Sequence, residues 1–352
     1  MRNPISPLVA LALGSSLVLA ACGGGGGDDS GSTAGGDCED VTLRLSHQWP
    51  EATGEDGDFR SLIAQKFAEG VEEETDGQVK VQVFPNSTLS KSTEQYDAMM
   101  NGSIDMSVFP LDYASGRVPE WSVTLMPGLV RNHAQAQSWE GSPIGDALVA
   151  NMEENGAHLL TWVWNAGAIG SKTDPIVSPS DVEPGMTMRA AGSYVEFMLE
   201  DAGAGISSLP SNEIYTAMQT GVLDAAVTST GSFASYNLQE QVKSFTSPTE
   251  NTFWFMFEPL IISTGSYEKL CSDQQAAVDK VGADLQDYAY TASEEDDARV
   301  EKIFADAGVE VVQMDDAAFD EWLELAQKQW DAYAADVEGG AELLELAQEQ
   351  HD

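Results

Sequence analysis

The sequence predicts an α/β protein with two similar lobes, and a repeated helix–glycine–strand unit is the main reason. Residues 209–228 have the pattern of a short helix that starts at Ser211, ends at Gly221 and leads into an apolar strand. Glycine takes the left-handed conformation of a helix end at little cost. An upstream copy matches at six positions with one constant offset: Glu94, Tyr96, Ala98, Met99, Gly102 and Asp105 against Glu213, Tyr215, Ala217, Met218, Gly221 and Asp224. Tyr215, Met218 and Val222 keep the spacing of an apolar helix face.

The length and the net charge of the chain exclude some classes of architecture and binding partner. The chain has 352 residues, enough for two lobes of ordinary size, and the offset is far too long for a solenoid repeat. It carries 16 Lys+Arg against 58 Asp+Glu, a formal charge of −42. Such a surface excludes nucleic acid and electrostatic docking to anionic lipid. We interpret the acidity as a solubilising surface, on which an Arg inside a pocket would be conspicuous.

The N-terminus has the pattern of an export signal. A basic Arg2 precedes an apolar run over residues 7–20, and Leu19-Ala20-Ala21-Cys22 resembles a bacterial lipobox. We therefore expect a signal peptide over residues 1–21, a lipid anchor on Cys22 and a glycine-rich tether over residues 22–40. A plain secretory peptide is the alternative.

Two further cysteines, Cys38 and Cys271, remain in an exported body. They are expected either to form a disulfide or to stay as two free thiols. Neither has metal-ligand spacing to a His, and we expect no metal and no cofactor.

The first part of the body predicts alternating strands and helices. Residues 41–45 and 79–83 alternate apolar and polar side chains as strands do, and residues 59–71 form an amphipathic helix between them. With the first copy of the repeated unit, this order predicts a mainly parallel sheet with helices on its faces. The loop after the first strand contains Gln48 and Trp49, at a position where open α/β sheets form ligand crevices.

The middle of the chain predicts strands over residues 158–164 and 186–189, with a helix over 194–201. The apolar run 251–262 predicts a buried strand. We expect the chain to cross between lobes near Asn165 and near Phe253.

The rest of the chain is expected to be helical. Ser272 and Gln275 have the spacing of a capping box at the start of a long helix. The final stretch predicts a packing stripe across the body, formed by Phe319, Trp322, Leu323, Ala326, Trp330 and Tyr333.

Taken in order, several motifs resemble the DctP-type substrate-binding proteins of TRAP transporters. The most specific is EIYTAMQTGVLD at residues 213–224, supported by FPN at 84–86, LMPGL at 125–129 and GMTMR at 185–189. The resemblance implies a periplasmic-binding-protein fold of type II, with crossing strands and a long helix joining the lobes. We expect lobe I over 41–165 and 255–295, lobe II over 166–254, and C-terminal helices over 296–352.

The resemblance also implies that the protein is not an enzyme. It would bind a small carboxylate, as a monomer, and deliver it to the membrane subunits of a TRAP permease. The family's Arg at the position of Arg189 typically pairs with the ligand carboxylate, and a guanidinium matches two carboxylate oxygens. The alternative for Arg189 is an exposed strand end paired with a surface acid.

The sequence departs from the family at two places. Many relatives carry a second Arg after the strand at 158–164, where this chain has Asn165, and Thr228 and Ser229 replace a usual Asn region. These changes put dicarboxylates and sialic acid in doubt and offer neutral hydrogen bonds instead. We expect an apolar or aromatic monocarboxylate, or a zwitterion held by aromatic faces. The aromatic candidates, each of which could instead be core, are Trp49, Trp164, Phe233 and Trp254.

Other roles stay open at this point. Glu213 could contact the ligand, although its first-turn position favours a helix-dipole role. His47 is a candidate polar wall group, and Asp224 a structural one. A ligand-sensing lipoprotein without a permease is one alternative function. An exported hydrolase is another, but the sequence has no G-x-S-x-G or H-E-x-x-H motif.

Overall fold

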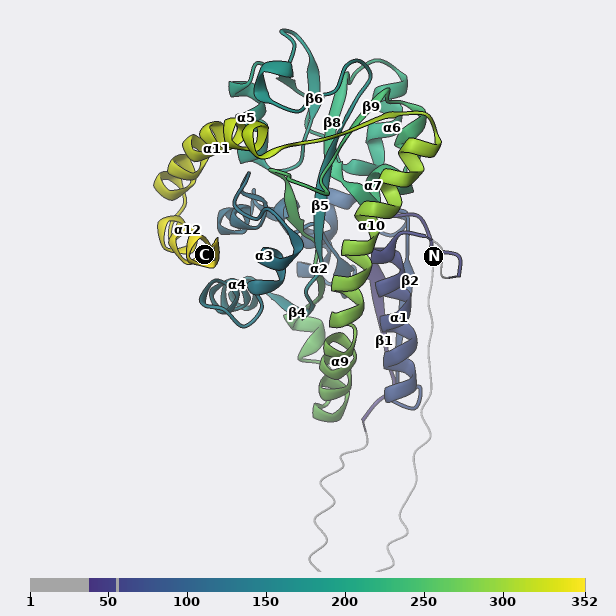
Figure 1. Ribbon diagram of the computed structural model, residues 1–352. Coiled ribbons are helices and arrows are strands. Elements are labelled where there is room, and N and C mark those ends of the chain that lie inside the picture. Colours follow the sequence, from purple (N-terminus) through teal and green to yellow (C-terminus); the bar gives the residue numbers. More distant parts are fainter. Residues whose placement is uncertain (1–37, 55–56, 352) are drawn as a thin grey trace, which may run out of the picture. The chain divides into compact units, whose positions relative to one another are not determined.

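Two mixed β-sheets flanked by helices make up the computed structural model, which describes residues 38–54 and 57–351 (Figure 1). Cys22 and the signal segment lie outside the described residues. Within the described ranges, no helix is long and apolar enough to cross a membrane.

The first sheet has the strand order β2-β1-β3-β11-β4. β1 pairs in parallel with β2 and β3, whereas β11 runs antiparallel to β3 and β4. We call this sheet with its covering helices lobe I. Its strands are β1 Val41–Ser46, β2 Val79–Phe84, β3 Met106–Val108, β4 Ala157–Thr161 and β11 Leu260–Ser263.

The second sheet has the order β12-β9-β5-β8-β6-β7, and β10 pairs with β5. We call this sheet with its helices lobe II, and Figure 1 shows β5 running between the two sheets. Its strands are β5 Trp164–Ser171, β6 Thr187–Arg189, β7 Gly205–Ile206, β8 Ala225–Ser229, β9 Ser244–Ser247, β10 Phe255–Phe257 and β12 Glu310–Gln313.

The predicted two-lobe α/β fold is confirmed, but three details were wrong. The sheets are mixed, because β5 and β11 run back against their neighbours. The strand expected over residues 158–164 is broken, so that β4 belongs to lobe I and β5, including Asn165, to lobe II. The C-terminal stretch is not all helical, since β12 extends the second sheet. The residue limits of the lobes stay a prediction.

The repeated unit takes the same conformation twice. A single 3-10 turn and a six-residue helix, α2 Gln95–Met100 or α6 Ile214–Gln219, lead to a glycine with positive φ, 74° at Gly102 and 78° at Gly221. Each unit then supplies a buried strand. The paired acids also correspond: Asp105 accepts a hydrogen bond from the Arg44 backbone N–H, and Asp224 from that of Thr187. The structural role predicted for Asp224 therefore agrees with its contacts.

Local predictions around α6 were less accurate. The Ser211 side chain does not cap the helix, because a 3-10 turn over Ser211–Glu213 comes first. Val222 is 53% exposed, because it follows the helix end at Gly221 and leaves the apolar face.

Helices cover both sheets and link them. The residues predicted for the buried face of α1 are buried, and α11 spans the lobes: Trp322 donates to the Val177 carbonyl, and Tyr333 to that of Glu120. Apart from α2 and α6, the helices are α1 Phe59–Glu74, α3 His133–Ser138, α4 Pro143–Glu154, α5 Ser193–Asp201, α7 Thr230–Ser235, α8 Thr264–Tyr267, α9 Ser272–Asp284, α10 Gln286–Asp306, α11 Asp316–Asp336 and α12 Gly340–Gln348.

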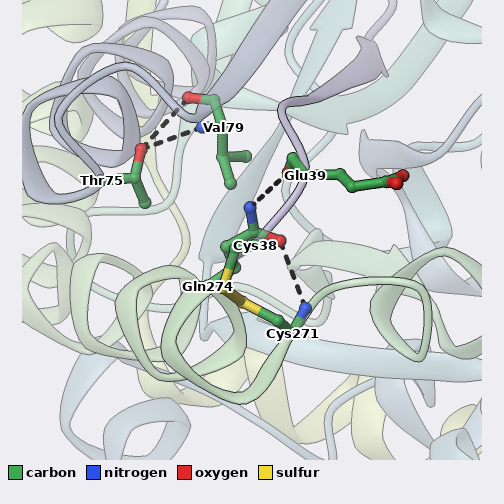
Figure 2. Close-up of a disulfide and its surroundings, with 6 residues drawn as sticks. All are labelled: Cys38, Glu39, Thr75, Val79, Cys271 and Gln274. Atoms are coloured by element: carbon green, nitrogen blue, oxygen red, sulfur yellow. Dashed lines mark hydrogen bonds between the residues drawn. A yellow bond between two sulfur atoms is a disulfide. The ribbon is translucent and has the colours of Figure 1, made fainter. Parts of the chain in front are cut away.

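A disulfide joins Cys38 to Cys271, the pairing that the sequence left open (Figure 2). It ties the segment before β1 to the start of α9. The capping residue of α9 is Cys271 instead of Ser272, and its backbone N–H donates to the Gln274 side chain, which itself donates to the Glu39 carbonyl. The predicted Ser272–Gln275 box was therefore one residue out of register.

Close packing fixes one position of β5. A Cβ built on Gly167 would lie 2.2 Å from Cε3 of Trp254, so no side chain fits there. Trp254 is in turn held by an N–H donated to the Ala191 carbonyl.

Candidate ligand-binding site

Arg189 ends the short strand β6 and is 1% exposed. Its Nε donates to the Leu209 carbonyl, Nη1 to the Val227 carbonyl and Nη2 to the Tyr113 hydroxyl, at 2.9, 2.9 and 3.2 Å. A guanidinium has five N–H groups, so one remains on each Nη atom. Two N–H donors on one guanidinium are what bidentate carboxylate binding uses.

Arg189 has only neutral hydrogen-bond partners among the described residues. All three of its partners are neutral oxygens, and it forms no ion pair with a carboxylate of the described residues. Buried charges in proteins are normally paired, because desolvation of an isolated ion is costly. Arg189 is therefore suited to receive an anionic group.

A second buried Arg, Arg60 on α1, contrasts with Arg189. Arg60 is 0% exposed and forms ion pairs with Asp58 at 2.5 Å and Glu258 at 2.6 Å. Its Nη1 also donates to Ser229 Oγ at 2.9 Å, and its guanidinium lies 4.1 Å from the Trp49 ring. Sequence reasoning missed both Arg60 and Glu258. The helical spacing of Arg60 with buried Ile63 and Phe67 was a signal that could have placed it inside.

Asn165 and Ser229 belong to this Arg60 cluster, as polar groups on lobe II strands. Asn165 Nδ2 donates to Glu258 Oε2 at 2.5 Å. Ser229 accepts from Arg60 and donates to Ser232. The structure therefore brings these two predicted residues together, but their hydrogen bonds go to protein charges.

Burial and ion pairing shift the pKa of a carboxyl group in opposite directions, and the balance differs between Asp58 and Glu258. Burial by itself would raise the pKa of Asp58, but the Arg60 charge and hydrogen bonds from Arg60 and Ser235 hold it below its usual range. For Glu258 burial prevails, and the pKa is raised although Arg60 partly opposes this. Glu258 also lies close enough to Arg189 for that positive charge to lower its pKa.

The loop after β1 contributes buried polar atoms without protein partners. These are both ring nitrogens of His47, Oε1 of Gln48 and Nε1 of Trp49. His47 stacks on Trp49 at a centroid distance of 5.8 Å. Burial lowers the His47 pKa to about 4, with Asp58 opposing and Arg60 adding to the shift, so the ring is neutral at pH 7. A neutral imidazole offers one donor and one acceptor.

The two lobes meet at this loop and at α7. Tyr236 donates to the Gln48 carbonyl, Ser235 donates to Asp58, and Tyr113 accepts from both Arg189 and the Ser211 backbone N–H. These bonds join residues that follow the strands of lobe I to residues of lobe II. The described conformation therefore has the lobes in contact around the two arginines.

A cavity of about 310 Å³ adjoins Arg189. Its walls include Tyr113 and Leu209, which accept hydrogen bonds from the guanidinium, and Glu196, whose pKa is raised by burial. Both lobes supply its lining, since Thr93 and Tyr113 come from lobe I and residues 190–192 from lobe II. The volume suits a small organic molecule.

The remaining aromatic residues predicted for the site are buried, as is Thr228. Trp164 is buried with an unpartnered indole N–H, and Thr228 is buried on β8. Phe233 packs against Phe245 and Phe304 in the core of lobe II, so it is not a ligand wall. Trp254 is core as well, fixed against Gly167.

Glu213 is exposed in the turn before α6, outside the buried cluster. The carboxylates that lie in the buried cluster are those of Asp58 and Glu258. Among the described residues, no group of three or more His, Cys, Asp and Glu could hold a metal ion.

Comparison with known proteins identifies the family. The description "Bacterial extracellular solute-binding protein, family 7" (DctP) belongs to a family profile that matches residues 49–336. A "Solute-binding protein" from Albidiferax ferrireducens is 42% identical over 308 residues, covering 87% of this chain and 91% of that protein.

Two crystal structures of TRAP periplasmic solute-binding proteins share the fold. One, from Rhodoferax ferrireducens with bound malonate, has a TM-score of 0.85 at 42% identity and covers 88% of this chain and 98% of that one. The other, from a Sulfitobacter species with bound β-D-galacturonate, has a TM-score of 0.80 at 25% identity, with 88% and 100% covered.

The matched family consists of proteins that bind solutes and do not transform them, which agrees with the prediction that the chain is not an enzyme. The matched region includes Arg189 and every strand of both sheets except β1. The chain therefore belongs to the DctP family of bacterial extracellular solute-binding proteins, the family of the TRAP periplasmic receptors.

Proposed function

We propose that this protein captures a small organic acid between its lobes by binding the ligand carboxylate to Arg189. The observation that carries the proposal is the buried guanidinium with one free N–H on each Nη atom and no carboxylate partner in the described chain. A carboxylate would neutralise the charge and accept both N–H groups. Malonate and galacturonate, the ligands of the two related structures, are both carboxylates.

The favoured ligand is a monocarboxylate with an apolar or aromatic part, or a zwitterion. The Trp49 ring lies against Arg60, and Trp164 packs on Trp139 and Phe257 one residue before Asn165. Both indole N–H groups have no partner in the described residues. Indoles can contribute both ring faces and donors to a ligand. Gln48, Thr228 and Ser229 add neutral polar groups to the same region.

The closed protein then hands its cargo to the membrane subunits of a TRAP permease, which an ion gradient drives. A lipid on Cys22 keeps the receptor at the outer face of the membrane, and the receptor acts as a monomer. The proposed lobe limits are residues 41–165 and 255–295 for lobe I and 166–254 for lobe II, except that strands β5 and β10 pair in the sheet of lobe II. Mass spectrometry of the exported protein tests the lipid, since an unmodified mature N-terminus would exclude it.

The binding test is a thermal-shift screen of organic acids followed by calorimetry on the best compound. Arg189→Ala is expected to lose most of the affinity, while Arg117→Ala, which removes an exposed Arg, retains it. Equal binding by Arg189→Ala and the parent would refute the site. Tight binding of malonate with no response to aromatic acids would refute the ligand class.

Transport is tested separately, by reconstituting the receptor with its permease subunits in vesicles under an ion gradient. We expect uptake of the identified acid only when the receptor is present. Binding without receptor-dependent uptake would instead support a sensing role.

A further inference from the structure

Glu258 occupies the short link between β10 and β11, where the chain returns from lobe II to lobe I. Its side chain is 3% exposed. Both hydrogen bonds that it receives, from Arg60 Nη1 and Asn165 Nδ2, fall on the same oxygen, Oε2. The other oxygen, Oε1, receives no hydrogen bond from the described part of the chain. A carboxylate can accept about four, so Glu258 keeps accepting capacity inside the site.

Arg60 and Asn165 hold this carboxylate in one place. Arg60 is itself fixed by Asp58, which accepts from its Nε and Nη2 at 2.8 and 2.5 Å, and by Ser229. Ser229 lies two residues after Val227, whose carbonyl binds Arg189. Glu258 is therefore connected to Arg189 through hydrogen bonds of Arg60 and through the β8 backbone between Ser229 and Val227.

The formal charges of these four side chains sum to zero, although Arg189 itself forms an ion pair with neither carboxylate. Arg60 and Arg189 supply two positive charges, and Asp58 and Glu258 supply two negative ones. A bound monocarboxylate would leave one negative charge in a buried cluster, and a dicarboxylate two. A ligand that also carries a positive charge would leave none, and uncompensated buried charge is strongly unfavourable.

We propose that Glu258 is a specificity-determining residue which accepts a hydrogen bond from an ammonium or hydroxyl group of the ligand, with Arg189 binding the carboxylate. The inference rests on the proposed function and extends it to a ligand class. That class consists of amino acids and hydroxy acids, with amino acids bound more tightly. Monocarboxylates without such a group bind more weakly than these, and dicarboxylates more weakly still. The unpartnered His47 and Gln48 side chains supply further polar groups to such a ligand.

Matched ligands test this without altering the protein. Phenylglycine, mandelate and phenylacetate share one skeleton and differ in an ammonium, a hydroxyl or a hydrogen at C2, and alanine, lactate and propionate form a smaller series. Calorimetry is expected to rank ammonium above hydroxyl above hydrogen in at least one series, with at least tenfold between the extremes. Malonate should bind more weakly than the best member. Equal affinities within both series, or no binding in either, would overturn the inference.

Glu258→Gln assigns the preference to its residue. This variant should lose at least tenfold in affinity for the ammonium ligand and little for the unsubstituted acid. Glu74→Gln, which removes a carboxylate paired with Lys280 at the surface, should keep the ranking. Glu258→Gln also weakens the ion pair with Arg60, so its melting curve must show that the variant is folded. Asn165→Ala is a milder second variant, which is expected to reduce the preference for the ammonium ligand. A folded Glu258→Gln with an unchanged ranking contradicts the assignment.

The two proposals can fail separately. If Arg189→Ala abolishes binding but the ligands show no ranking, only the role of Glu258 is refuted. If the ranking is found but Arg189→Ala binds normally, the carboxylate site itself is wrong.

Discussion

The Tyr113 hydroxyl of lobe I lies 3.2 Å from Nη2 of Arg189 in lobe II and accepts a hydrogen bond from it. The same oxygen accepts from the Ser211 backbone N–H, also at 3.2 Å. One phenol therefore orients the proposed carboxylate-binding group and joins the lobes. Since a hydrogen bond that involves a charged group contributes about 1.5–3 kcal/mol, Tyr113→Phe should weaken ligand binding by roughly 10- to 100-fold. Calorimetry checks this against Tyr215→Phe, whose hydroxyl bonds to exposed Glu240, and equal losses in both would rule out the linking role.

Arg189→Met should separate binding from stability. The variant removes a buried charge that forms no ion pair in the described residues, together with three hydrogen bonds to neutral oxygens, and these effects oppose each other. The melting temperature of the free protein should therefore change little. Affinity for the best organic acid should fall by about 100-fold or more, since loss of one partner of a buried charge pair costs roughly 2–5 kcal/mol. Arg189→Lys should recover only part of it, because an ammonium cannot bind a carboxylate through a planar fork. A large drop in melting temperature would mean that Arg189 is structural.

Arg60→Met is expected to do the reverse and destabilise the fold. Without Arg60, the buried Asp58 and Glu258 carboxylates lose their shared counterion. Breaking buried pairs of this kind costs about 3–5 kcal/mol, which should lower the melting temperature by roughly 5–15 °C. The control is Arg44→Met, whose partner Asp105 is paired nearer the surface and whose loss should cost less. Similar melting curves for Arg60→Met and the parent would contradict the role of Arg60 as counterion.

Replacement of the buried Asp112 should stabilise the protein to an extent that depends on pH. It is buried with Oδ1 unpartnered, and burial, with the nearby Glu196 charge, raises its pKa from 3.8 to about 7. The folded state thus binds the proton more tightly than the unfolded state, so the cost of the charged form grows from pH 3.8 and is complete above pH 7. Asp112→Asn should therefore stabilise the protein at pH 8, by at most on the order of 4 kcal/mol, and have little effect near pH 4. Melting temperatures of both proteins at the two pH values decide this, and a gain of equal size at both would exclude titration of Asp112 as its cause.

Local patterns predicted much of this fold. The glycine ends at 102 and 221, the strands β1 and β2 and the buried face of α1 depend on neighbours within a few residues, and such signals are visible in a sequence. The break between β4 and β5 was missed because the whole stretch is apolar and suits a strand. β12 was missed because its pairing with β9 depends on residues far away in the chain.

The candidate site was predicted only in part. Arg189 could be named because a family motif places it. Arg60 bonds to Ser229 and Glu258, which are 169 and 198 residues away, so only the folded chain brings them together. For Phe233 the sequence left both a ligand wall and a core position open, because an aromatic residue that follows a strand can face either one; in the structure it packs on Phe245 and Phe304.

The contact between Gly167 and Trp254 has an evolutionary consequence. With only 2.2 Å between a would-be Cβ at 167 and the indole, position 167 cannot gain a side chain while Trp254 and this packing are kept. Across homologous genes the two sites should therefore covary: a lineage that acquires alanine or serine at 167 should carry a smaller residue at 254, and lineages that retain the tryptophan should retain the glycine.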